Sequence, residues 1–155
     1  VNSLLDHLAM RTANLLEQTG GKALAIPASR TLDKADNRGN LSHKAVARLA
    51  GLGWIGKNIL LVNPEYGPRL RFATVLTDLE LEADAPLDRD CGGCTKCTDA
   101  CPAGAIRGVV AKPYPETREV CVDMAACVGK LAEFKAVLGK DICGVCIRVC
   151  PFARM

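Results

Sequence analysis

Hydrophobic positions along the first half of the chain alternate between helical and strand-like spacing. Residues 3–21 place leucines on one side of a predicted helix, and a pair of glycines ends it. A short apolar run at residues 22–29 is typical of a strand. After a polar loop, Ser42 is a suitable N-cap for a second helix that ends at Gly51.

Two more apolar runs, at residues 58–67 and 70–81, predict further strands. The acidic stretch that follows contains Pro86, and we place a domain boundary there, between residues 1–85 and residues 86–155. We therefore expect an α+β fold. A small helix-on-sheet part comes first, and a second domain dominated by cysteines follows it.

The glycines of residues 51–56 have the G-x-G-x-x-G spacing of dinucleotide-binding loops. Such a loop needs a strand before it and a helix after it, so that the pyrophosphate meets a helix N-terminus. Here the predicted order is helix, glycine turn, strand. The sequence therefore favours a tight reversal of the backbone over a nucleotide site.

Composition excludes several classes of function. The chain has 155 residues, of which 49% are hydrophobic, enough for one compact domain or two small ones. It has no apolar run long enough to cross a membrane and no signal peptide, so we expect a cytoplasmic protein without a membrane partner. The net charge of +3 comes from thinly spread basic residues, which do not form a nucleic-acid-binding stripe.

The nine cysteines are the most informative feature, and none of them precedes Cys91. A disulfide scaffold needs an oxidising compartment, and the sequence shows no secretion signal. Their crowding into one part of the chain instead indicates a local metal site.

Most of the cysteines form two runs that each end in Cys-Pro: Cys91, Cys94, Cys97 and Cys101, then Cys143, Cys146 and Cys150. Three thiolates spaced three residues apart can wrap a cubane, and the fourth ligates the other cluster in two-cluster ferredoxins. Zinc is the alternative, because two C-x-x-C pairs can bind it. A run of four cysteines ending in Cys-Pro favours two [4Fe–4S] clusters.

The crossover between runs assigns ligands to each cluster. Cluster 1 takes Cys91, Cys94, Cys97 and Cys150. Cluster 2 takes Cys101, Cys143, Cys146 and one more, either Cys121 or Cys127. Spacing alone does not choose between these two.

Five segments of the chain stand out together: AGLGWIGKN, NPEYG, VLTDLEL, CGGCTKCTDACPAGAI and CGVCIRVCP. In combination they resemble the epoxyqueuosine reductase family, whose members are cobalamin-dependent iron–sulfur enzymes of tRNA modification. The resemblance runs from about Leu41 to Pro151. It implies a two-cluster ferredoxin-like domain, preceded by the C-terminal half of a corrinoid-binding domain, much of which lies further upstream in the family. It also implies cobalamin as an additional cofactor.

The resemblance bears on individual residues as well. The family has an apolar-Asp-x-x-x-Cys-x-x-x-Leu segment that matches VDMAACVGKL, which implies Cys127 as the eighth ligand and leaves Cys121 spare. An ungapped alignment puts Asn37 where the family has a proton-donating aspartate. The catalytic residues are therefore unknown. His43, close by in sequence, is a further candidate acid.

The predicted function is an iron–sulfur oxidoreductase that passes low-potential electrons through two [4Fe–4S] clusters and is related to epoxyqueuosine reductase. Its electron donor would be a ferredoxin or flavodoxin, and its acceptor a corrinoid or a partner oxidoreductase. The family's tRNA substrate stays open for this chain. Two alternatives remain: a ferredoxin-like carrier or reductase subunit without tRNA-modification activity, and a module in which clusters or zinc only hold the fold together.

Overall fold

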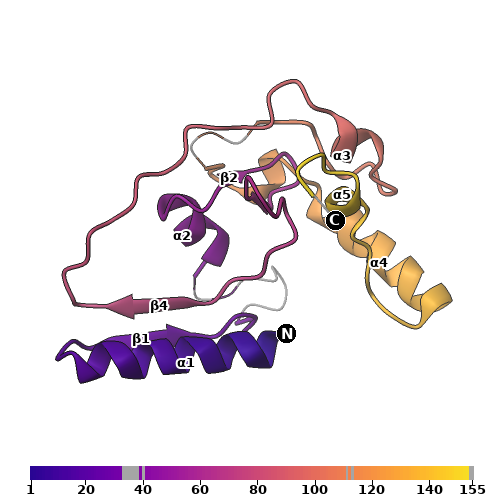
Figure 1. Ribbon diagram of the computed structural model, residues 1–155. Helices are drawn as coiled ribbons and strands as arrows, with labels where there is room; N and C mark the ends of the chain where they lie inside the picture. Colours follow the sequence, from indigo (N-terminus) through magenta and orange to yellow (C-terminus); the bar gives the residue numbers. More distant parts are fainter. Residues whose placement is uncertain (33–38, 40, 111, 113, 154–155) are drawn as a thin grey trace. The chain divides into compact units, whose positions relative to one another are not determined.

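The computed structural model describes residues 1–32, 39, 41–110, 112 and 114–153, and its helices and short sheets confirm the expected α+β class (Figure 1). The chain forms two compact units. The first contains Val1–Ala50 and Arg71–Ala85, and the second contains Gly51–Leu70 and Pro86–Met155. The expected boundary lies where the chain passes from the first unit to the second, between Ala85 and Pro86. Residues 51–70, however, were expected in the first part and pack within the second unit. The division into domains 1–85 and 86–155 stays a prediction.

The first unit places a helix against a small antiparallel sheet. Its elements are α1 (Asn2–Gln18), β1 (Ala23–Ile26), α2 (His43–Leu49) and β4 (Thr74–Thr77). In the sheet, Ala23 lies opposite Thr77 and Ile26 opposite Thr74. Helix α1 lies along both strands and buries the small side chains of Ala9 and Ala13 (Figure 1).

Helix α2 begins as its sequence predicts. Ser42 has an extended backbone, and its hydroxyl accepts a hydrogen bond from the Ala45 amide at 3.3 Å. Beyond the helix, Gly51 has a φ of +69°, a left-handed conformation that favours glycine. The chain then enters the second unit.

The glycine string forms part of a tight hairpin, β2 (Trp54–Ile55) and β3 (Leu61–Val62). A Cβ atom on Gly53 would lie 2.2 Å from the Val62 carbonyl oxygen, so only glycine allows the two backbones to approach this closely. The four strand residues are at most 2% exposed and belong to the core of the second unit. The reversal expected from the glycines is therefore a hairpin, and its first strand lies within the string.

The rest of the second unit consists of short helices and one longer helix: α3 (Lys96–Asp99), η1 (Arg118–Val120), α4 (Met124–Leu138) and α5 (Val145–Arg148). Ile106 and Val122 form an antiparallel bridge that joins the end of the first cysteine run to the start of α4. Within the described residues, no helix has both the length and the apolar character needed to span a membrane.

Candidate metal centre

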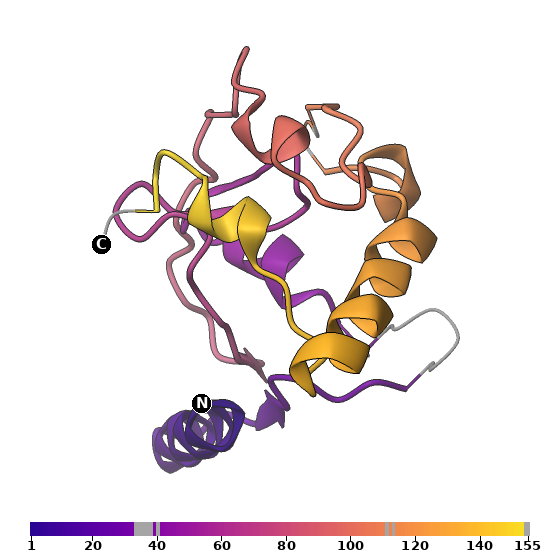
Figure 2. The same ribbon diagram turned by 90° about the vertical axis from the view of Figure 1, so that its right-hand side faces the viewer.

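Two short helices that lie side by side carry a cysteine from each run: Cys97 is in α3 and Cys146 is in α5 (Figure 2). Glycines with positive φ precede both helices, at +50° for Gly92 and +103° for Gly144. A Cβ atom built on Gly93 or Gly144 would meet no atom within 4 Å. The backbone of these loops therefore has open space at both glycines.

Three cysteines of the first run share their surroundings with one of the last run. Burial raises the pKa of the Cys97 and Cys150 thiols, and the charges of Cys91 and Cys94 raise both values further. We call Cys91, Cys94, Cys97 and Cys150 the first cysteine group. Its members are the residues predicted to ligate cluster 1.

A second set of thiols interacts in the same way. Burial raises the pKa of Cys127, and the charges of Cys101 and Cys143 add to this shift. Burial also raises the pKa of Cys146, and the charges of Cys143, Cys97 and Cys101 raise it further. We call Cys101, Cys127, Cys143 and Cys146 the second cysteine group. Helix α3, which carries Cys97, packs against α5, which carries Cys146, so the two groups are close together.

Cys121 is set apart from both groups. Its side chain is fully buried, and burial alone raises the pKa of its thiol, without a contribution from another cysteine. Its carbonyl oxygen accepts a hydrogen bond from the Arg107 amide at 2.8 Å, beside the Ile106–Val122 bridge. These surroundings favour Cys127 over Cys121 as the eighth ligand, an assignment that stays a prediction.

The start of α4 explains the segment that precedes Cys127. Asp123 is the N-cap, and its carboxylate accepts a hydrogen bond from the Ala126 amide at 3.0 Å. The Asp123 amide donates to the Ala105 carbonyl at 2.8 Å, which ties the helix to the end of the first cysteine run. Cys127 therefore lies in the first turn of a helix whose start is fixed beside the second group.

The donor set fits iron–sulfur clusters. Each cysteine group offers four thiols, the number of ligands that a [4Fe–4S] cluster takes. The two runs that end in Cys-Pro have the spacing found in two-cluster ferredoxins.

The turn between β2 and β3 brings a lysine side chain to the cysteines. The buried Lys57 donates a hydrogen bond from Nζ to the Cys94 carbonyl at 2.9 Å. Next to it, the buried Asn58 opposes the rise in the pKa of the Cys146 thiol through a side-chain hydrogen bond. Neither residue was predicted from the sequence, where the signal was a Lys-Asn pair just before the apolar run that contains β3.

Two other candidate residues lie in the first part of the chain. Asn37 is outside the residues that the structure describes. The Nδ1 atom of His43 lies 2.7 Å from the Thr74 hydroxyl oxygen, and its Nε2 atom lies 3.0 Å from the Pro27 carbonyl oxygen. Both ring nitrogens are thus engaged in tying α2 to the β1–β4 side of the first unit, which favours a structural role for His43.

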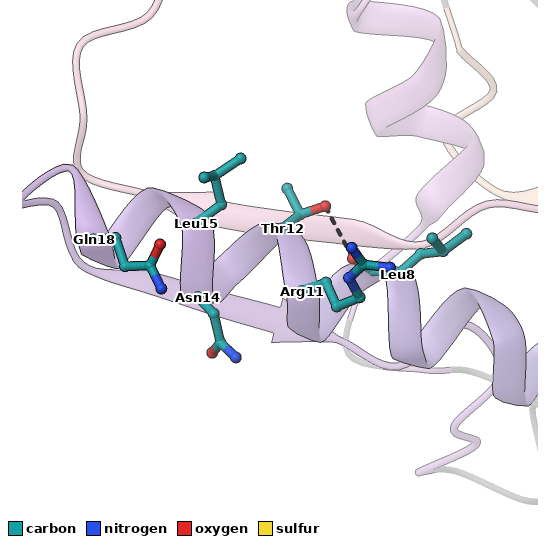
Figure 3. A pocket seen from close by; sticks show the side chains of 6 residues that line it. All are labelled: Leu8, Arg11, Thr12, Asn14, Leu15 and Gln18. Atoms are coloured by element: carbon teal, nitrogen blue, oxygen red, sulfur yellow. Dashed lines mark hydrogen bonds between the residues drawn. The ribbon is translucent and has the colours of Figure 1, made fainter.

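The hollows found on the first unit include no cysteine. One lies on the surface of α1 and is lined by Leu8, Arg11, Thr12, Asn14, Leu15 and Gln18 (Figure 3). Within it, the Thr12 hydroxyl donates a hydrogen bond to the Leu8 carbonyl at 2.9 Å. Another adjoins His43. Neither hollow is lined by a residue predicted to bind metal.

Known proteins share both the cysteine pattern and the fold. Residues 90–153 match the family model described as a 4Fe-4S dicluster domain, which supports two [4Fe–4S] clusters as the cofactors. A curated epoxyqueuosine reductase from Bacillus subtilis (strain 168) is 37% identical over 120 residues, which cover 75% of this chain and 30% of that protein.

Solved structures extend the similarity to nearly the whole chain. The epoxyqueuosine reductase from Streptococcus thermophilus matches with a TM-score of 0.73 and 26% identity, over 99% of this chain and 40% of that one. An epoxyqueuosine reductase with an epoxyqueuosine-modified tRNA-Tyr stem loop matches with a TM-score of 0.66 and 29% identity, over 96% of this chain and 38% of that one. The chain thus spans well under half the length of these relatives. It is an iron–sulfur protein related to the epoxyqueuosine reductases, with a 4Fe-4S dicluster domain.

Proposed function

We propose that this chain transfers low-potential electrons between two [4Fe–4S] clusters, as the electron-transfer part of an oxidoreductase related to epoxyqueuosine reductase. The observation that carries this proposal is the contact between the two cysteine groups. Cys97 and Cys146 interact electrostatically, and the helices that carry them pack together. Adjoining clusters favour rapid electron transfer, which a purely structural pair of metal sites does not need.

Each cysteine group would hold one cluster, and the bound clusters supply reversible one-electron chemistry. The chain orients the thiolates and partly excludes water from them. It also supplies hydrogen bonds to sulfur, of which one runs from the Ala105 amide to Cys101 Sγ at 3.4 Å. Such bonds and the degree of burial set the reduction potential.

The donor in this proposal is a low-potential carrier of the ferredoxin or flavodoxin type, and the acceptor is a corrinoid or a partner oxidoreductase. The resemblance to epoxyqueuosine reductases supports the corrinoid. The relative solved with a modified tRNA stem loop makes tRNA a candidate substrate for the protein to which this chain belongs. Cobalamin and tRNA both remain proposals for this chain.

A simpler electron carrier is the second candidate, favoured by Asn37 at the position of the family's acid. An asparagine amide has no acidic proton to give to a substrate. A carrier of this kind would reduce a partner protein and bind no corrinoid.

Cluster content and corrinoid binding test these proposals separately. Anaerobically purified protein should contain about eight irons and eight sulfides per chain, as two cubanes require. Stoichiometric zinc without sulfide would contradict the iron–sulfur proposal. Titration of the full-length gene product with cobalamin, followed by the corrinoid absorption, separates the two candidates: saturable binding supports the corrinoid enzyme, and its absence supports the carrier.

A further inference from the structure

We propose that Lys57, in the turn between β2 and β3, raises the reduction potential of the cluster held by the first cysteine group. It is a positioning residue that acts through the loop of the cluster ligands. The inference rests on the proposed function, because it requires both clusters to be bound.

Lys57 places a cation against the loop of the first cysteine group. Its side chain is only 6% exposed, and Nζ lies 2.9 Å from the Cys94 carbonyl oxygen. A buried ammonium is costly unless a negative charge compensates it. The Asp90 carboxylate is within electrostatic range of Lys57, but it forms its ion pair with Lys112 at 2.8 Å.

A bound cluster supplies the compensating charge. A [4Fe–4S] core with four thiolates is an anion, and its negative charge grows by one when it is reduced. The Lys57 ammonium therefore stabilises the reduced cluster more than the oxidised one, and raises the potential of the nearer cluster. The low exposure of Lys57 limits screening of this interaction by water and salt.

The turn that carries Lys57 has a strained and hydrogen-bonded backbone. Ile59, a β-branched residue, has a φ of +53°, a conformation that its side chain disfavours. The turn is closed by hydrogen bonds from the Ile59 amide to the Gly56 carbonyl and from the Gly56 amide to the Leu60 carbonyl, both at 2.8 Å. A Cβ atom on Gly56 would lie 2.8 Å from Asn58 Oδ1, so the glycine leaves room for the Asn58 amide.

Potentiometric titration of the holoprotein, monitored by electron paramagnetic resonance, tests the proposal. Lys57→Met should lower the midpoint potential of one cluster by at least about 59 mV, which is a tenfold change in its one-electron reduction equilibrium. The midpoint potential of the other cluster should shift less. Lys135→Met removes the same charge from the exposed surface of α4 and should leave the difference between the two potentials unchanged.

A charge-conserving variant separates electrostatics from packing. Lys57→Arg should keep both potentials and the full iron content, even if Lys57→Met loads iron poorly. Loss of iron from Lys57→Arg, or a fall in its midpoint potential like that of Lys57→Met, would overturn the proposal. It would also be overturned if Lys57→Met shifted both midpoint potentials equally, as Lys135→Met is expected to do. If the native protein lacks two iron–sulfur couples, the proposed function itself fails, before any variant is compared.

Discussion

At the residue scale, the nine cysteines have distinct surroundings that their spacing only partly reveals. Spacing and the crossover rule predicted seven of the ligands, but left Cys121 and Cys127 equivalent. In the structure, Cys127 interacts with Cys101 and Cys143, whereas Cys121 is buried apart from the other thiols. That difference depends on the bridge and cap before α4, which bring distant residues together.

We expect Cys121→Ser to retain both clusters and Cys127→Ser to lose or convert one. A hydroxyl in the buried Cys121 site costs about 1–3 kcal/mol of stability if it finds no hydrogen-bond partner, but it removes no ligand. Iron and sulfide content, together with electron paramagnetic resonance spectra, measure the outcome. The opposite behaviour of the two variants would assign the eighth ligand to Cys121.

Asn37 gives a second prediction at this scale. We expect the complete native protein, supplied with cobalamin and a low-potential donor, to convert little epoxyqueuosine to queuosine in tRNA. The Asn37→Asp variant should gain activity, because a general acid contributes a factor of about 10² to 10⁴ in rate. Robust turnover by the native protein would show that another group supplies the proton.

The contact of Lys57 with the cysteine loop could not be predicted from the sequence. No spacing rule identifies a polar side chain that reaches Cys94 from 37 residues earlier in the chain. The position of Lys57 depends on the hairpin that carries it.

At the scale of elements, local signals predicted helices better than strands. The first helix was expected at residues 3–21 and spans Asn2–Gln18, and Ser42 caps the second as expected. The strand expected at residues 70–81 shrinks to Thr74–Thr77, because its partner β1 offers only four residues for pairing. Strand β2 has two residues, too few for an alternating pattern to reveal it.

The hairpin can be tested with a pair of glycine substitutions. Gly53→Ala should destabilise the holoprotein by about 1–3 kcal/mol or more, because the new methyl group collides with the Val62 carbonyl oxygen. Denaturant unfolding under anaerobic conditions provides the measurement.

Gly129→Ala is the matched control. Gly129 lies inside α4, and a Cβ atom there would meet no atom within 4 Å. Alanine should therefore stabilise the helix by about 0.5–1 kcal/mol. Equal effects of the two substitutions would contradict the close approach of β2 and β3.

At the scale of the whole molecule, we expect residues 91–155 to depend on bound metal for their fold. Helix α4 buries none of its residues fully, and Val137 and Leu138 are 81% and 62% exposed. Few large apolar side chains beyond Asp90 are buried, so cluster binding should provide much of the folding free energy of this region.

Removal of iron by a chelator should therefore unfold residues 91–155 while α1 keeps its hydrogen bonds. Hydrogen exchange of the apo and holo forms measures protection along the chain. Equal protection of α1 and of residues 91–155 in the apo form would show that the polypeptide folds without its clusters.

The assignment of residues 51–70 to the second unit could not be predicted from the sequence. It depends on packing between distant segments, such as the edge-to-face contact of Trp54 and Phe152, whose ring centres lie 5.0 Å apart. Arg89 adds a cation–π contact 5.0 Å from the centre of the Trp54 ring. The pattern of the cysteines predicted two clusters, but not the hairpin that packs with them.

The central claim is that two redox-active clusters share one small unit, and counting electrons tests it most directly. Anaerobic protein with a full complement of iron should be titrated with a low-potential reductant while the loss of visible absorption is recorded. We expect about two electrons per chain, one for each [4Fe–4S] cluster. Uptake of a single electron, or of none in a protein that contains zinc, would contradict the account.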